Sequence, residues 1–145
     1  MAVTVRKITL WRKEVENRPG VLAGALGPLA DAGTSLQVVM AYRYPGNETR
    51  AAIELYPVAT KKVVVAAQAA GMSASTIPTL LVQGDDRPGL GHTIGQAIAD
   101  AGINVGFLVT QVIGRKYSAV IGFDSEEDAR NAAALIRKAS ARKKK

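Results

Sequence analysis

Two short loops in the sequence could bind a small molecule that carries both an ammonium and a carboxylate group. Asn17 and Asp86 each stand directly before an Arg-Pro-Gly tripeptide, and their side chains can accept a hydrogen bond from an ammonium group. The apolar run after each tripeptide predicts a strand that ends, turns sharply and opens a helix. The first amides of a helix have no partner within it, and the helix dipole favours an anion there. Together these groups describe a site for a free α-amino acid.

The two loops belong to an internal repeat. The separation between Pro19 and Pro88 equals that between Asp31 and Asp100, each of which begins an Asp-Ala-Gly tripeptide. The apolar pattern of residues 51–56 returns in residues 118–123 with a slightly shorter offset. Matches that stay in register over this distance indicate a duplicated module.

Local patterns predict the same order of elements in both halves. The first half reads as a strand over 8–15, a helix over 22–33, a hairpin over 35–56, a helix over 60–71 and a short strand over 72–77. The second half reads as a strand over 79–84, a helix over 90–102, a hairpin over 104–123 and a helix from Ser125 to about residue 139. The second half lacks a last strand. Residues 3–5 either fill that vacant edge or leave it open.

This order predicts an α+β fold of two ferredoxin-like β-α-β-β-α-β modules, each with an antiparallel sheet covered by helices on one face. We expect a first module over residues 1–77, a second over 78–140 and a basic, disordered tail over 141–145. Each module is small, and 48% of the residues are apolar, so we expect the two to pack together.

Composition excludes several classes of function. The absence of cysteine excludes disulfides, thiolate catalysis and thiolate metal sites. No apolar run approaches the roughly 20 residues of a membrane span, and the first residues do not resemble a secretory signal, so we expect a cytoplasmic protein. The net charge is +7, and Arg142 to Lys145 supply four of these charges. A terminal charge run is typical of a solvated tail, with a nucleic-acid-binding arm as the alternative.

The two loops resemble those of a known family, the ACT domains, which are small β-α-β-β-α-β modules that sense amino acids. Residues 16–22, ENRPGVL, resemble the effector loop of serine-sensing phosphoglycerate dehydrogenases, although Val15 stands where that form has a histidine. Residues 86–90, DRPGL, resemble the general family form. The resemblance covers both modules and implies an amino-acid effector bound between modules, a homodimer and a regulated enzyme as partner.

The resemblance also implies roles for individual residues. Asn17 and Asp86 would bind the amino end of the effector, and Asn104 would reach a ligand across an interface, with Ser35 in its place in the first module. The complete set of candidate ligand-binding residues covers both loops and both strand openings: Asn17, Arg18, Pro19, Gly20, Val21, Leu22, Ser35, Asp86, Arg87, Pro88, Gly89, Leu90, Asn104 and Val105. No catalytic residue, metal ligand or cofactor site is predicted.

Alternative interpretations exist for the same residues. Arg-Pro-Gly could be only a favourable turn, with Asn17 and Asp86 capping helices. Pro28 should kink the first helix or delay its regular part, so we expect the second loop to bind better. A regulatory protein that binds an amino acid is the leading prediction. A nucleic-acid-binding protein that uses the basic tail is the alternative, and the sequence shows no acid–base pair, nucleophile or phosphate loop for an enzyme.

Overall fold

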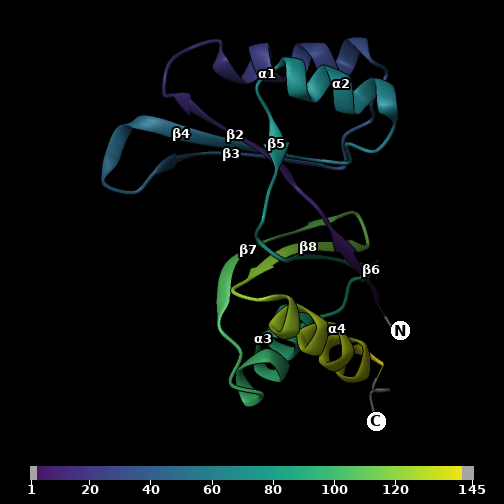
Figure 1. The fold of residues 1–145 in the computed structure, drawn as a ribbon. Helices are drawn as coiled ribbons and strands as arrows, with labels where there is room; N and C mark the ends of the chain where they lie inside the picture. The colour runs from purple at the N-terminus through teal and green to yellow at the C-terminus, as the bar shows by residue number, and fades with distance from the viewer. Residues whose placement is uncertain (1–2, 142–145) are drawn as a thin grey trace. The chain divides into compact units, whose positions relative to one another are not determined.

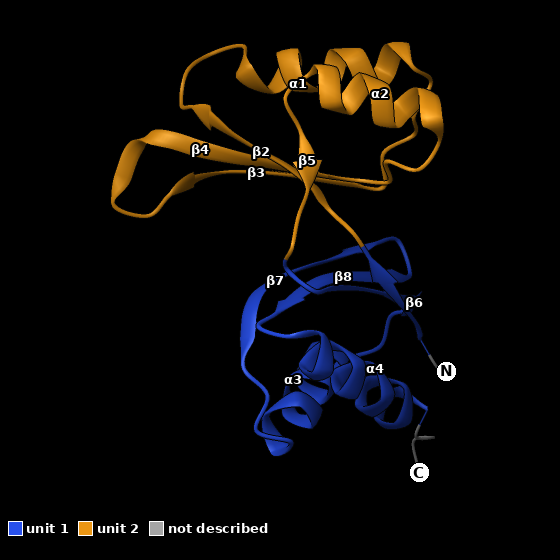
Figure 2. Cartoon of the chain, viewed as in Figure 1, with its two compact units in different colours: residues 1–8, 77–145 blue, residues 9–76 orange. Residues whose placement is uncertain are grey.

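The computed structural model describes residues 3–141, which divide into two compact units. One unit comprises residues 9–76, and the other comprises the segments 1–8 and 77–145 (Figure 2). We call the first the inserted unit, because it interrupts the second in sequence, and the second the discontinuous unit. Residues 142–145, most of the predicted tail, lie outside the described residues.

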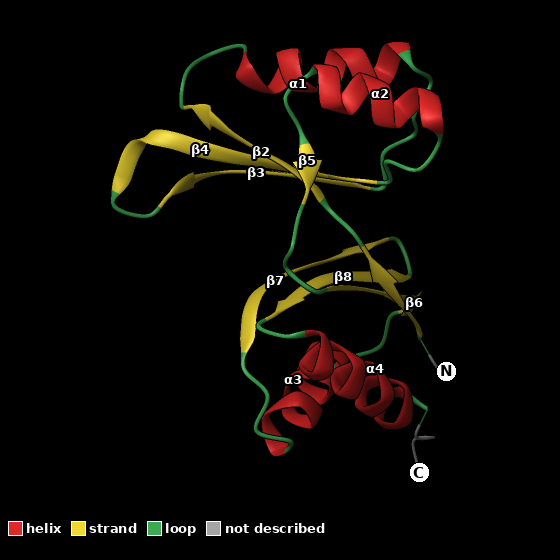
Figure 3. Cartoon of the chain, in the orientation of Figure 1, coloured by secondary structure: helices red, strands yellow, loops and turns green. Residues whose placement is uncertain are grey.

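The inserted unit has the predicted β-α-β-β-α-β order. Its elements are β2 (Trp11–Glu16), α1 (Val21–Asp31), β3 (Val38–Tyr44), β4 (Asn47–Tyr56), α2 (Lys61–Ala69) and β5 (Ser73–Ala74). The strands form an antiparallel sheet in the order β3-β4-β2-β5, and both helices cover one face of it (Figure 3). Alternate residues of β2 and β4, such as Val15, Ile53 and Leu55, pack against Ala25 and Leu29 of α1.

The discontinuous unit builds the same sheet from two separate segments (Figure 1). Its elements are β1 (Thr4–Ile8), β6 (Thr79–Asp85), α3 (Leu90–Asp100), β7 (Val105–Ile113), β8 (Lys116–Phe123) and α4 (Glu126–Ser140). The antiparallel order is β1-β6-β8-β7. The core includes Leu90, Ile94 and Ile98 of α3, which recur every four residues and so share one face of the helix.

The N-terminal strand β1 fills the edge that the second half of the sequence leaves vacant. Val3 and Val5 are buried in the core of the discontinuous unit. The Arg137 guanidinium donates a hydrogen bond of 2.8 Å from Nη2 to the carbonyl oxygen of Val5. The observed division therefore differs from the predicted one at the N-terminus. Residues 3–8 contribute to the unit of the second module, because Val3 and Val5 complete its core.

Helix α1 contains Pro28 and still begins directly after the first loop. It runs without interruption from Val21 to Asp31, so the proline does not delay its start.

Among the described residues, no helix has the length and the apolar character needed to cross a membrane.

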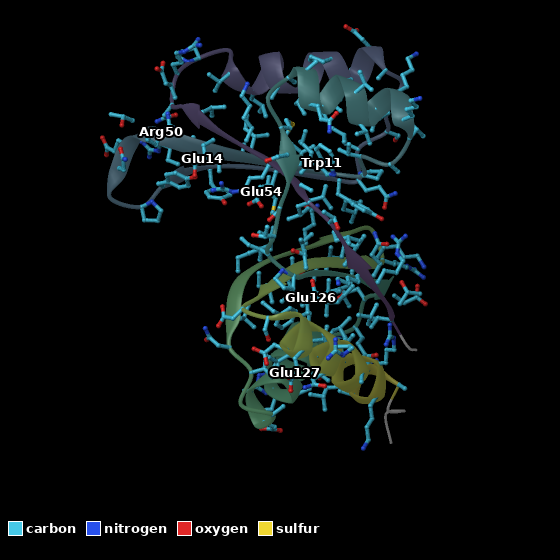
Figure 4. All side chains as sticks on the ribbon, in the orientation of Figure 1. Trp11, Glu14, Arg50, Glu54, Glu126 and Glu127 are labelled. Atoms are coloured by element: carbon cyan, nitrogen blue, oxygen red, sulfur yellow. The ribbon has the colours of Figure 1, made fainter. Side chains whose placement is uncertain are left out.

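Helix α4 begins at its N-cap Ser125, as predicted, and this serine caps the helix with its side chain. Ser125 Oγ accepts a hydrogen bond of 3.1 Å from the amide of Asp128, and Glu126 and Glu127, labelled in Figure 4, place acidic charge in the first turn. Ser125→Ala removes the cap and should lower the free energy of unfolding by about 1 kcal/mol, measured by urea denaturation. Ser125→Asp keeps an acceptor at this position and should remain near wild type. Equal losses in both variants would contradict a capping role.

Candidate functional site

Both Arg-Pro-Gly loops form the strand, turn and helix start that the sequence predicts. Gly20 and Gly89 are the helix N-caps, with φ of 90° and 82°. This left-handed conformation is readily adopted by glycine, which explains the residue after each proline. Helices α1 and α3 begin at the next residue, Val21 and Leu90. Each loop therefore presents the first amides of an eleven-residue helix beside the end of a strand.

The amide of Asn17 is anchored on the hairpin between β3 and β4. Its Nδ2 donates a hydrogen bond of 2.8 Å to the carbonyl oxygen of Glu48, and its backbone amide donates one of 2.9 Å to Thr49. The Nδ2 bond uses one of the two side-chain N–H groups and turns the donor side of the amide towards the hairpin. The oxygen Oδ1 is then the atom of Asn17 that an ammonium group could use.

A cleft of about 220 Å³ lies between the first loop and the strands β3 and β4. Three of the predicted site residues line it: Asn17, Val21 and Leu22. The other lining residues come from strands and are mostly small or aliphatic: Val15, Ala41, Tyr42, Arg43, Ala51, Ala52 and Ile53. Within the described residues, no carbonyl accepts a hydrogen bond from the amide of Val21. The loop thus brings Asn17 and a free helix amide to the wall of one cavity.

The corresponding space in the discontinuous unit is filled by Tyr117. In the two sheets, Val15 pairs with Ala51 and Gly84 pairs with Tyr117. Val15 and Gly84 stand at the same distance in sequence before their loop prolines, so Ala51 and Tyr117 occupy equivalent positions. Tyr117 is only 5% exposed. A Cβ built on Gly91, the repeat equivalent of Leu22, would lie 3.7 Å from the Tyr117 hydroxyl. The aromatic ring therefore occupies the volume that Ala51 leaves open.

Other contacts tie the second loop to its own unit. Arg87 Nη1 donates a hydrogen bond of 3.1 Å to the carbonyl oxygen of Ser140 at the end of α4. The amide of Leu90 donates one of 3.2 Å to Arg87, and the amide of Asp86 donates one of 2.8 Å to Arg115. The first helical amide of α3 is therefore already engaged within the loop.

The remaining predicted site residues lie outside the cleft. Arg18 is exposed and forms an ion pair of 3.4 Å with Glu16. Ser35 is exposed before β3, and Asn104 is exposed directly before β7, where Val105 packs on the core.

The cleft residues of β3 and β4 were not predicted from the sequence. The sequence comparison, which matches residues 51–56 with 118–123, sets Ala51 against Ser118 and was wrong by one residue, because the strand registers make Tyr117 the counterpart of Ala51.

A second hollow of about 430 Å³ opens beside the same loop, between β2 and the first turns of α1. Its charged residues are largely paired with one another. Arg50 Nη2 lies 3.5 Å from Glu14 Oε2, and both residues are labelled in Figure 4. Hydrogen bonds from Tyr44 and Arg12 lower the pKa of Glu14. Because these charges already have partners, the apolar cleft is the better candidate site.

Comparison with solved structures identifies the fold. No family model and no curated protein matches the chain. Protein BT0572 from Bacteroides thetaiotaomicron is similar in structure, with a TM-score of 0.73, 13% identity and coverage of 90% of this chain and 88% of that one. The regulatory subunit of aspartate kinase from Thermus thermophilus is similar with a TM-score of 0.62, 16% identity and coverage of 96% and 97%. The chain has the tandem ACT fold.

The same fold also forms part of longer enzymes. Aspartate kinase from Synechocystis matches 98% of this chain with 27% of its own, at a TM-score of 0.62 and 18% identity. At such identities the likeness shows the fold alone. The fold alone does not test whether residues 16–22 resemble a serine-sensing loop in function, and that resemblance stays a prediction.

Proposed function

We propose that this protein is a regulatory protein that binds a free amino acid at its first Arg-Pro-Gly loop. The observation that carries the proposal is the cleft under this loop, which is lined both by Asn17 and by the start of α1. Oδ1 of Asn17 accepts from the ammonium group of the effector. The amides of Val21 and Leu22 bind its carboxylate, aided by the helix dipole. From the sequence we expected the second loop to bind the effector better. We now propose the first loop, because Tyr117 fills the equivalent space under the second.

The regulated partner is an enzyme on another chain. Support comes from the similar structure of a separate regulatory subunit of aspartate kinase, which matches this chain over nearly its whole length. The candidate residues form no catalytic set of their own. A homodimer, a cytoplasmic location and a neighbouring module that completes the effector site remain predictions from the sequence.

Thermal-shift screening of the twenty amino acids tests the proposal. An effector at about 100 times its dissociation constant should stabilise the protein by roughly 2.7 kcal/mol. The expected result is a shift for one amino acid or a chemically related group. The methyl ester and the N-acetyl form of that effector serve as controls, since each lacks one of the two recognised charges. A screen without any shift, confirmed by calorimetry, would contradict the proposal.

Deletion of Arg142 to Lys145 should leave effector binding unchanged. The cleft is built from residues 15–53, and a terminal run of cations adds only a screened, sequence-independent attraction for polyanions. Calorimetry compares the full chain with the truncated one, using the effector and a single-stranded RNA. If only RNA binds, and the deletion abolishes that binding, the nucleic-acid alternative is correct.

A further inference from the structure

We propose that the cleft selects an amino acid with a branched aliphatic side chain, and that Ala41 and Ala51 set the size of the side chain it accepts. This inference rests on the proposed function, because it concerns the same site. It adds the chemical class of the effector, which the loop motif does not specify. The argument depends on the walls of the cleft, on its few polar groups and on its size.

The walls facing the cavity are hydrocarbon. Val15, Ala51 and Ile53 form the deep part, where the three residues are 8%, 8% and 1% exposed. Leu22, which is 39% exposed, lies at the mouth. None of the described residues that line the cleft is a carboxylate. A lysine or arginine effector would therefore lose water around its side-chain charge without gaining a counter-ion, which is costly.

The polar groups of the cleft are few enough to be used by the backbone end of the effector. Arg43 lies opposite Ala51 in the β3–β4 register, on the helix-facing side of the sheet. No carboxylate of residues 3–141 forms an ion pair with Arg43, so its guanidinium can bind the effector carboxylate together with the amides of Val21 and Leu22. Asn17 serves the ammonium group. The Tyr42 hydroxyl is engaged, because it donates a hydrogen bond of 2.8 Å to Glu54 Oε2.

No polar group then remains for the side chain of the effector. A hydroxyl, amide or charged side chain would be buried against hydrocarbon without a partner. A branched aliphatic side chain loses nothing in this environment and gains from the removal of its surface from water. Polarity therefore favours valine, leucine and isoleucine over serine, asparagine and glutamate.

Two alanines determine how much room this side chain has. The repeat shows the consequence of a larger residue, since Tyr117 at the position of Ala51 fills the space under the second loop. Ala41 faces Ile53 across the β3–β4 pair on the same side of the sheet. The cleft volume of about 220 Å³ lies below the roughly 300 Å³ at which pockets for drug-sized ligands begin. The cleft thus suits a small aliphatic side chain.

Isothermal titration calorimetry on the full chain tests this inference with valine, leucine, isoleucine, serine, lysine, glutamate and phenylalanine. We expect the tightest binding from one of the three branched amino acids. Ala41→Leu should weaken binding of that amino acid about tenfold or more, because discrimination by one or a few methylene groups is of this order. Ala41 is exposed on an edge strand, so the larger residue enters the cleft and not the core. Ala30→Leu, on an exposed position of α1 outside the cleft, is the matched control and should bind as wild type.

The outcomes separate this inference from the proposed function. If wild type binds serine, lysine, glutamate or phenylalanine more tightly than any branched amino acid, the inference is overturned and the sensor proposal stands. Equal binding by Ala41→Leu and wild type also overturns the inference. If Ala41→Leu does not fold, Ala41→Val takes its place. This variant should shift the binding preference from leucine towards valine. An unshifted preference would overturn the inference. If no amino acid binds, the proposed function fails first.

Discussion

Gly122→Val should destabilise the discontinuous unit by about 3 kcal/mol, the upper part of the usual range for overpacking. Gly122 on β8 pairs with Phe107 on β7, and the Phe107 ring lies directly over the glycine. A Cβ built on Gly122 would lie only 2.0 Å from Phe107 Cε2, much closer than two carbon atoms can approach. Valine can fit only if the ring moves or the pairing of β7 with β8 changes.

Urea denaturation, followed by circular dichroism, measures this loss. The matched control is Gly95→Ala in α3, because a Cβ there meets no atom within 4 Å and alanine favours the helix. It should be neutral or slightly stabilising. The double variant Gly122→Val with Phe107→Ala should recover part of the loss, because it removes the ring that clashes. A Gly122→Val protein as stable as wild type would show that the ring is not held over the glycine.

Much of the fold could be predicted because its signals are local. The left-handed glycine after each proline, the apolar runs of β4 and β8, and the Ser125 cap are all set by residues within a few positions of one another. The repeat then supported each assignment twice. These features gave the order of elements and the antiparallel, one-sided architecture.

The strands at one edge of each sheet were harder to predict, because their pairing is not local. β1 pairs with β6, so Thr4 meets Gln83, a residue far along the chain. β5 has only two residues and pairs only with Trp11 and Arg12. Neither segment has enough residues for a distinctive period, and tertiary packing determines which sheet each joins.

The candidate site was only half predictable for a similar reason. The loop residues could be identified by their types and order, and they occur in both modules. What distinguishes the modules is a side chain on a different strand, Ala51 in one and Tyr117 in the other. Its effect appears only when the strand register places it under the loop. The sequence therefore favoured the second loop, whereas we propose the cleft under the first loop as the site.

Gly20→Val should abolish effector binding, and this variant tests which loop is used. Gly20 has φ of 90°, and valine in this conformation would cost roughly 1–2 kcal/mol or move the loop. A Cβ on Gly20 meets no atom within 4 Å, so the expected effect is backbone strain and not a clash in the core. A displaced loop no longer presents Asn17 and the amide of Val21 to the same cleft. The roughly 2.7 kcal/mol of stabilisation at saturating effector should therefore disappear.

Gly89→Val is the matched control, because it makes the same substitution at the equivalent position of the second loop. Gly89 has φ of 82° and the same open space around its Cβ, so the strain should be similar. Its loop, however, lies over the buried Tyr117 ring, and the cleft of the inserted unit stays intact. Gly89→Val should therefore lose comparable stability without effector and keep the full thermal shift with it. The reverse result, with binding lost in Gly89→Val and kept in Gly20→Val, would place the effector at the second loop, where Asp86 would have to bind its ammonium group.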